Sequence, residues 1–95
     1  MLEIRAMQAE DLEAVVRTES QIFSRPWSRK GFEDALRQKE TIYLVAYEKD
    51  ILAGYCGLLQ SFDEADITNV AVVEKFRKKG VATELLEQLF LRGYE

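Results

Sequence analysis

The 95-residue sequence contains no histidine and a single cysteine, Cys56. Without histidine, this chain cannot by itself form a Ser-His-Asp or Cys-His catalytic group or a histidine-ligated metal site. One cysteine excludes an internal disulfide, a CxxC redox pair and a cysteine-based zinc cluster. An unpaired thiol fits a reducing compartment, most simply the cytosol. We therefore expect a cytoplasmic protein without a metal centre.

Proline and long hydrophobic runs are also scarce. The chain has one proline and five glycines, and no Gly/Ser/Pro-rich linker or internal repeat divides it. Its apolar stretches fall far short of the roughly 20 residues that a membrane-spanning helix needs. Residues 1–5 lack the apolar core of a signal peptide. The sequence therefore predicts one domain over residues 1–95 and no membrane association.

The charge balance is acidic, with 13 Lys and Arg against 17 Asp and Glu and a net charge of −4. This argues against general nucleic-acid binding. The hydrophobic content of 47% is typical of a globular domain. Any site that attracts phosphate must then be a local basic patch on an acidic molecule.

The first half of the sequence predicts a strand followed by two helices. Residues 2–6 alternate apolar and polar side chains, which is typical of a strand with one buried face. A helix is expected from about Ala9, and it should end before Pro26. Ser28 is placed to cap a second helix. The expected inner face of the first helix comprises Leu12, Val15, Val16, Glu19, Ile22 and Phe23, and that of the second Phe32, Ala35 and Leu36.

The second half predicts three strands and a helix. The strands are expected at residues 41–47, 51–60 and 66–73, with polar turns between them that favour an antiparallel meander. Gly54 and Gly57 suggest a bulge or a close backbone approach. A basic loop at residues 74–79 precedes a helix from Gly80. Its expected inner face comprises Val81, Leu85, Leu86, Leu89 and Phe90.

The predicted order is therefore β-α-α-β-β-β-α, an α+β (mixed α/β) fold with a largely antiparallel sheet flanked by helices. Residues 92–95 stand where the last helix would end and a further parallel strand would begin. We thus expect this domain to be the N-terminal portion of a larger one, truncated before its C-terminal strands. The free strand edge after Val73 could be covered by a second copy of the chain, so a homodimer is an open alternative.

The segment that carries chemistry is the basic loop with the start of the last helix. The first N–H groups of a helix have no internal acceptors, and the helix dipole adds positive charge there. Phosphate oxygens satisfy both needs. Gly80 and Ala82 leave room for a ligand, and Lys75 with residues 77–79 adds four positive charges. This is a candidate diphosphate site, although a solvated basic loop before a core helix fits equally well on these grounds.

Known phosphate motifs do not decide between these two interpretations. The Walker A pattern G-x-x-x-x-G-K-[ST] is absent, and the lone Gly80 does not make a G-x-G-x-x-G turn. However, residues 77–82, RKKGVA, resemble the R/Q-x-x-G-x-G/A motif of the GCN5-related N-acetyltransferases (GNAT family), in the expected context between a strand and an amphipathic helix. Residues 26–28 (PWS), 63–65 (DEA) and 69–72 (NVAV) are similar to the ribosomal-protein-alanine N-acetyltransferase branch of this family.

The resemblance implies an enzyme that transfers acetyl from acetyl-CoA to a primary amine, with the N-terminal amine of a ribosomal protein as the expected acceptor. It implies that the strand backbone at Val70, Ala71 and Val72 pairs with the pantetheine arm, and that the Val72 N–H is a candidate oxyanion donor. It implies that the amides around the motif hold the diphosphate. The residues concerned are Arg77, Lys78, Lys79, Gly80, Val81, Ala82 and Thr83.

The catalytic base and acid of the similar enzymes lie after the motif helix, beyond Glu95, so no catalytic residue is assigned here. Asp63, Glu64 and Asp66 are expected to form a solvated turn or a rim that attracts amines. Two other functions remain alternatives. One is a non-catalytic module that binds CoA or a nucleotide, and the other is an interaction domain whose basic loop docks on a polyanion.

The remaining aromatic and thiol groups have competing interpretations. Trp27 could line an acceptor groove, or it could anchor the corner between the first two helices. Cys56 is expected to be a packed, inert thiol. Tyr43, Tyr47 and Tyr55 are expected to lie on the sheet rather than to act as catalytic acids.

Overall fold

A computed structural model gives the fold, and it describes residues 2–61 and 64–93. The elements follow the order expected from the sequence. They are β1 (Leu2–Ala6), a 3-10 turn η1 (Ala9–Asp11), α1 (Leu12–Ile22), α2 (Arg29–Arg37), β2 (Thr41–Glu48), β3 (Ile51–Gln60), β4 (Ala65–Val72), a second 3-10 turn η2 (Glu74–Phe76) and α3 (Val81–Gly93).

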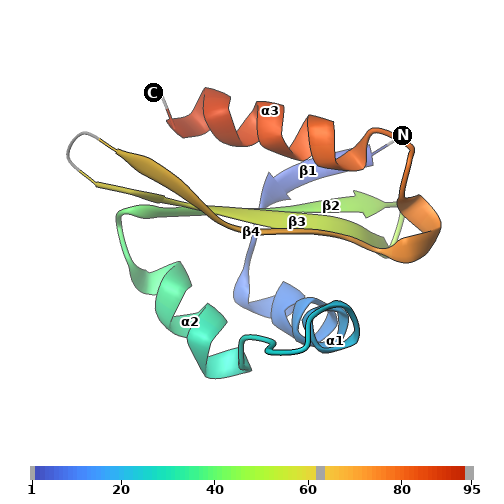
Figure 1. Ribbon diagram of the computed structural model, residues 1–95, viewed down its shortest axis with the longest axis horizontal. Coiled ribbons are helices and arrows are strands. Elements are labelled where there is room, and N and C mark those ends of the chain that lie inside the picture. Colours follow the sequence, from blue (N-terminus) through green and yellow to red (C-terminus); the bar gives the residue numbers. More distant parts are fainter. Residues whose placement is uncertain (1, 62–63, 94–95) are drawn as a thin grey trace.

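The described strands form one sheet in the order β1-β2-β3-β4, and every neighbouring pair is antiparallel. The sheet is the middle of three layers. Figure 1 shows α1 and α2 on one face and α3 on the other. Because each strand alternates its side chains between faces, the sheet builds two hydrophobic cores. The mixed fold class predicted from the sequence is confirmed.

The two cores differ in their chemistry. The core under α1 and α2 is rich in aromatic residues and comprises Met7, Leu12, Val15, Phe32, Ala35, Tyr43, Val45, Leu52, Tyr55 and Ala71. The core under α3 is almost entirely aliphatic and comprises Leu44, Ala46, Ala53, Cys56, Leu58, Phe76, Val81, Leu85 and Leu89. The sheet thus separates an aromatic layer from an aliphatic one.

Two bulges interrupt the sheet next to Gly54 and Gly57, as the sequence predicted. Ala53 is the extra residue of β3 where it pairs with β2, and Thr68 is the extra residue of β4 where it pairs with β3. A Cβ on Gly54 would lie 2.6 Å from the carbonyl oxygen of Ala71, and one on Gly57 would overlap the ring of Tyr43. Both positions therefore depend on the missing side chain.

The helix boundaries follow local signals. The Ser28 hydroxyl accepts a hydrogen bond from the Gly31 N–H at 3.1 Å, which confirms the expected cap of α2. The first helix begins later than expected, because residues 9–11 form the 3-10 turn η1 instead. Asp11 ends that turn, and its carboxylate accepts from the Gln8 N–H and from the guanidinium of Arg5.

One prediction about α3 is wrong. Phe90, expected to face inward, is 43% exposed. The sheet contact is made by Val81, Leu85 and Leu89, which recur every four residues along one face. The next position, Leu86, packs at the edge of that face, and Phe90 lies beyond it. The inner face of α3 is therefore narrower than its hydrophobic pattern suggested.

Two further observations bear on the expectations from sequence. Over residues 2–61 and 64–93, no helix is long and apolar enough to cross a membrane. Asp63, part of the expected acidic turn, lies outside the described residues, whereas Glu64 and Asp66 are exposed as expected.

Candidate functional site: the start of the last helix and the edge of the sheet

The start of α3 is an open array of backbone N–H groups. The Glu84 N–H donates to the carbonyl of Gly80 at 3.0 Å, and this is the bond that opens the helix. The N–H groups of Val81, Ala82 and Thr83 come before that bond, so they have no acceptor within the helix. The helix dipole concentrates partial positive charge at the same place. These three amides are therefore available to an anion.

Two left-handed backbone conformations shape the loop that leads to these amides. Gly80 has a φ of +81° and Lys78 a φ of +64°. Glycine adopts this region without steric cost, whereas a side chain is strained there. A Cβ on Gly80 would have no atom within 4 Å, so the space in front of it is open. Gly80 thus allows the loop to turn, and it also leaves the amides accessible.

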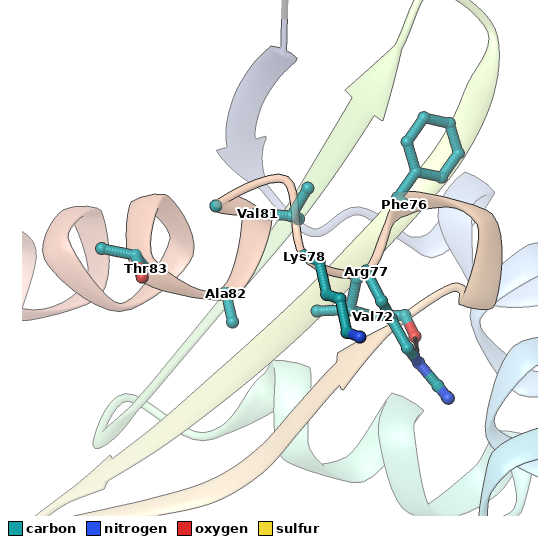
Figure 2. A pocket seen from close by; sticks show the side chains of 8 residues that line it. Val72, Phe76, Arg77, Lys78, Val81, Ala82 and Thr83 are labelled. Carbon is teal, nitrogen blue, oxygen red and sulfur yellow. Dashed lines mark hydrogen bonds between the residues drawn. The ribbon is translucent and has the colours of Figure 1, made fainter.

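A surface cavity of about 410 Å³ lies at this place. Figure 2 shows that its walls come from the end of β4, the loop and the first turn of α3, with Ala82 and Thr83 on the helix side. The side chains of Arg77 and Lys78 run past Val72, while that of Phe76 points the other way. The lining residues are Val72, Phe76, Arg77, Lys78, Gly80, Val81, Ala82 and Thr83.

The outer edge of β4 continues from this cavity. The Val73 N–H donates to the carbonyl of Ala53 at 2.8 Å, and Gly54 pairs with Val72 in the same register. Antiparallel ladders alternate bonded and non-bonded pairs. The backbone groups of Ala71 therefore face β3, whereas those of Val70 and Val72 point away from it. In the described chain, no other strand lies beyond β4.

The basic side chains of the loop have distinct positions. The Arg77 Nε–H donates to the carbonyl of Val72 at 3.1 Å, which confirms that this carbonyl points outward. The ammonium groups of Lys75 and Lys79 lie 5.3 and 5.9 Å from the centre of the Phe76 ring. This cation–π geometry holds both charges near the loop without burying them. Of the four basic residues of the loop, Arg77 and Lys78 line the cavity.

The structure brings together most of the residues that the sequence proposed. Seven of them line the cavity: Val72, Arg77, Lys78, Gly80, Val81, Ala82 and Thr83. Lys79 is not among the lining residues, and its ammonium group lies over the Phe76 ring instead. Val70 presents its backbone on the same strand edge. Ala71 differs from the other two strand residues, because its backbone pairs with β3 and its side chain is buried under α1 and α2.

Sequence reasoning missed Phe76. The sequence pattern places Phe76 in a polar, basic loop, yet it is buried, ends the turn η2 and lines the cavity. A large apolar residue within a run of charges was the available signal. Its burial anchors the loop to the core under α3, and the loop conformation depends on that anchor.

A cluster of aromatic and polar side chains lies on the opposite face of the sheet, under α1 and α2. The Trp27 ring packs 5.2 Å from that of Phe32 and 6.3 Å from that of Tyr43, which supports its role as an anchor of the helix corner. The Tyr43 hydroxyl lies 2.9 Å from the Thr68 hydroxyl, and it donates to the amide oxygen of Asn69 at 3.4 Å. Burial raises the pKa of Tyr43, so its phenol stays neutral.

The other predicted groups on the sheet are paired, and they are buried except for Tyr47, which is partly buried. The Tyr55 hydroxyl donates to Glu19, and burial together with that bond raises the pKa of Tyr55. The Tyr47 hydroxyl donates to Asp11, and burial raises its pKa as well. Cys56 is packed in the core as expected, and burial raises the pKa of its thiol to about 12, which disfavours the reactive thiolate.

Comparisons with known proteins agree with this geometry. A Bacillus subtilis (strain 168) protein, named as a candidate [ribosomal protein bS18]-alanine N-acetyltransferase, is 34% identical over 83 residues. The match covers 86% of this chain and 55% of that protein, so the chain spans about half the length of this relative.

Solved structures give the same result. The ribosomal-protein-S18-alanine N-acetyltransferase from Escherichia coli is 26% identical, with a TM-score of 0.82, over 94% of this chain and 57% of that one. The PaiA N-acetyltransferase from Thermoplasma acidophilum, solved with coenzyme A, is 17% identical and shares the fold with a TM-score of 0.86, over 99% of this chain and 72% of that one. The sequence profile of the Acetyltransferase (GNAT) family matches residues 8–92. The chain therefore belongs to the GNAT acetyltransferase family.

Proposed function

We propose that the chain binds acetyl-CoA and forms part of an enzyme that acetylates a primary amine, namely the N-terminal α-amine of a ribosomal protein. Membership of the GNAT family supports acetyl transfer from acetyl-CoA. The name of the Bacillus subtilis relative supports a ribosomal protein as the acceptor. A ribosomal acceptor also fits the cytoplasmic location that the unpaired cysteine favours.

The observation that carries the proposal is the open array of amides at the start of α3. Three N–H groups without helical acceptors face a cavity that no side chain of Gly80 obstructs. A diphosphate places several anionic oxygens in a small volume, so it can satisfy these donors together. Arg77 and Lys78 add charge from the same wall of the cavity. An uncharged ligand would leave this arrangement largely unused.

The edge of β4 suits the extended part of the same ligand. Val70 and Val72 direct their backbone groups outward, so an amide-containing arm such as pantetheine can pair with them as an added strand would. A thioester bound along this edge lies near the Val72 N–H, which is then a donor for the oxygen that gains charge during acyl transfer.

The proposed reaction replaces the C–S bond of the thioester with a C–N bond and moves one proton from nitrogen to sulfur. The nitrogen of the neutral amine attacks the thioester carbonyl, the C–S bond breaks, and the proton lost by nitrogen ends on the CoA thiol. Positioning and oxyanion stabilisation contribute most in such a direct transfer. None of the described residues is assigned as base or acid. Glu64 and Asp66 are exposed, in keeping with a solvated rim that attracts amines.

A substitution that adds charge without harming the helix tests the diphosphate site. Ala82→Glu places a carboxylate in the first turn of α3, where the helix dipole favours an acid. We expect the folded structure to persist and the affinity for acetyl-CoA, measured by calorimetry, to fall at least about tenfold, or about 1.4 kcal/mol. Gln88→Glu, at an exposed position of α3, is the matched control and should leave the affinity for acetyl-CoA within twofold.

Equal affinities of the Ala82→Glu and Gln88→Glu proteins would contradict the diphosphate site. The acceptor is tested separately, with a peptide that begins with alanine. Its acetylation is detected by mass spectrometry. Acetyl-CoA binding without turnover by the full-length protein would favour the non-catalytic module instead. Binding to polyanions that acetyl-CoA does not displace would favour a docking domain.

A further inference from the structure

The Arg77 side chain occupies part of the strand edge that the proposed ligand would use. Its Nε–H donates to the carbonyl oxygen of Val72 at 3.1 Å. The register of β4 directs this carbonyl outward, away from β3. An N–H of an added strand would donate to the same oxygen at about 2.9 Å, which is nearly the same distance. Arg77 therefore lies where a donor of that strand would lie, and the two compete for Val72.

The bond to Val72 is the only bond that holds the Arg77 side chain in the described part of the chain. Within residues 2–61 and 64–93, its two Nη groups form no hydrogen bond and no ion pair. The side chain is exposed and runs past Val72 (Figure 2). A single hydrogen bond at an exposed position contributes little net free energy, because water replaces the lost partner. Arg77 can therefore leave Val72 at a small cost.

The cavity at the start of α3 gives the guanidinium a second position. Arg77 and Val72 both line this cavity, and so do Val81 and Ala82, whose N–H groups have no acceptor within the helix. A guanidinium donates two parallel N–H bonds to phosphate oxygens, and these charge-assisted bonds are stronger than one bond to a neutral carbonyl. A diphosphate at these amides would therefore draw Arg77 away from Val72 and uncover the carbonyl.

The other side of Arg77 offers no comparable attraction. There it lines a second cavity, of about 340 Å³, between the end of α1 and the turn η2. Glu74 is the acidic residue of that cavity, and it is exposed and forms no ion pair with Arg77. The remaining lining residues are Thr18, Gln21, Ile22 and Val73. The guanidinium thus has two favoured positions, one on the Val72 carbonyl and one on an anion at the start of α3.

We propose that Arg77 is a specificity-determining residue that selects thioesters carrying a diphosphate. Its side chain covers the Val72 carbonyl until a diphosphate binds the guanidinium, and the pantetheine arm then pairs with the uncovered edge of β4. This inference rests on the proposed acetyltransferase function, and it names the residue that distinguishes CoA thioesters from pantetheine thioesters without a nucleotide. The two parts of the cofactor bind with positive coupling, because the first removes the competitor of the second.

Arg77→Lys separates the positive charge from the competing bond. Lysine keeps a charge for the diphosphate, but it has a methylene group at the ε position and so lacks the N–H that covers Val72. Because Arg77 is exposed, the variant should fold as the wild type does. The same exchange at Arg37 is the matched control, since its side chain is 78% exposed and lies on α2, across the sheet from α3.

The two halves of the cofactor, ADP and pantetheine, serve as separate probes of the full-length protein, with affinities measured by NMR titration. In the wild type, saturating ADP should raise the affinity for pantetheine about fivefold, the factor expected when one competing hydrogen bond is removed. In Arg77→Lys, pantetheine alone should bind about fivefold more tightly than it binds the wild type, and ADP should add less than about twofold. Arg37→Lys should behave as the wild type.

The Arg77 Nε–H gives a direct spectroscopic signal of the same movement. Its resonance is identified by its absence from the spectrum of Arg77→Lys. In the wild type, the signal should shift when ADP is added, because the hydrogen-bond acceptor changes from a carbonyl to a phosphate oxygen. Adenosine, which carries no phosphate, is the control and should leave the signal where it is.

Each outcome decides one of the two proposals. Equal pantetheine affinities of the wild type and Arg77→Lys would overturn the role of Arg77, as would an Nε–H signal that ADP does not move. Pantetheine binding that neither protein shows would overturn it too. The wild type alone can also decide: if ADP binds and does not raise its affinity for pantetheine, Arg77 does not compete with the arm. All these results leave acetyl-CoA binding intact, whereas a wild type that binds neither ADP nor acetyl-CoA would overturn the proposed function and this inference with it.

Discussion

The two faces of the sheet are stabilised in different ways. Under α3, the buried residues are aliphatic apart from Cys56 and Phe76, and they interact mainly through packing. Under α1 and α2, buried Asp11, Glu19 and Asn69 form hydrogen bonds with tyrosine hydroxyls. Packing is non-directional and tolerates exchange of similar side chains, whereas hydrogen bonds require one geometry.

The difference matches the tasks proposed for the two faces. α3 has to present its first turn to a ligand, and this requires that the helix stay docked rather than that any single side chain be oriented. The opposite face has to hold an irregular segment at residues 24–28 against the sheet. Directional bonds serve that purpose, because a loop offers few backbone bonds of its own. Three substitutions test this comparison.

The largest loss of stability is expected from Leu85→Ala on the aliphatic face. Leu85 is fully buried and packs against β3 and Gly54. Removing its side chain leaves a cavity, at a cost of about 3 kcal/mol in the free energy of unfolding. Urea denaturation measures this value. Leu91→Ala is the matched control, because Leu91 is 63% exposed on the same helix and should change stability by less than about 0.5 kcal/mol.

Cys56 gives this experiment a second measurement. Its thiol lies 3.8 Å from the Leu85 carbonyl oxygen, and its pKa of about 12 suppresses the reactive thiolate. A thiol reagent at pH 8 should label the folded wild type far more slowly than the unfolded chain. Leu85→Ala should accelerate labelling, since α3 then opens more often. Identical rates in both proteins would show that the aliphatic core does not govern the docking of α3.

A smaller loss, about 2 kcal/mol, is expected from Asp11→Asn on the polar face. Asp11 accepts two bonds of 2.8 Å from Arg5, and also bonds from the Gln8 N–H and the Tyr47 hydroxyl. The cost stays below that of a fully buried ion pair, because the Arg5 side chain is 38% exposed. Thermal or urea unfolding at pH 7 measures the difference.

The effect of Asp11→Asn should depend on pH. Burial alone would raise the pKa of Asp11, but the bonds from Arg5, Gln8 and Tyr47 outweigh it and hold the pKa below its usual value. A carboxyl with a lowered folded pKa stabilises the protein above its unfolded pKa, about 3.9, and this contribution is lost as the pH falls further. The two proteins should therefore differ by a constant amount from pH 7 to 5 and converge below about pH 4. A difference that does not shrink between pH 5 and pH 3 would contradict the charged network.

The smallest effect is expected from Ser28→Ala, at about 1 kcal/mol. The substitution removes the hydroxyl that accepts from Gly31 and leaves one N–H of the first turn of α2 without that acceptor. Chemical denaturation should register the loss, and the same change at exposed Ser24 should not. A stability unchanged by Ser28→Ala would mean that packing of Phe32 and Ala35 alone determines where α2 begins.

Local patterns in the sequence predicted most of the fold. The alternation of residues 2–6, the cap at Ser28 and the four-residue recurrence of Val81, Leu85 and Leu89 each act within one element, and the structure confirms them. A cavity also lies at the motif of residues 77–82, whose amides and charges are neighbours in the chain; the diphosphate site predicted there stays a prediction.

The features that sequence did not predict depend on contacts between distant residues. Glu19 lay in an apolar stripe, but its partners Tyr55 and Trp27 come from another strand and a loop, and no spacing indicates them. Phe90 follows the helical pattern, yet the width of the sheet contact decides that it is exposed. The inward backbone of Ala71 follows from the register with β3, and a single residue shift would have reversed it.

Gly54 lies under α3 and next to β4, so a substitution at this position would affect the strand that bears the proposed ligand edge. Any side chain there would meet the Ala71 carbonyl at 2.6 Å and the Val72 Cα at 3.4 Å, and so would push β4 outward. β4 bears the outer edge on which the proposed ligand lies. A methyl group added beneath α3 would thus alter ligand affinity while every residue around the cavity stayed the same. Natural sequences that keep the binding loop but lose this glycine would have to accommodate the change in strand spacing.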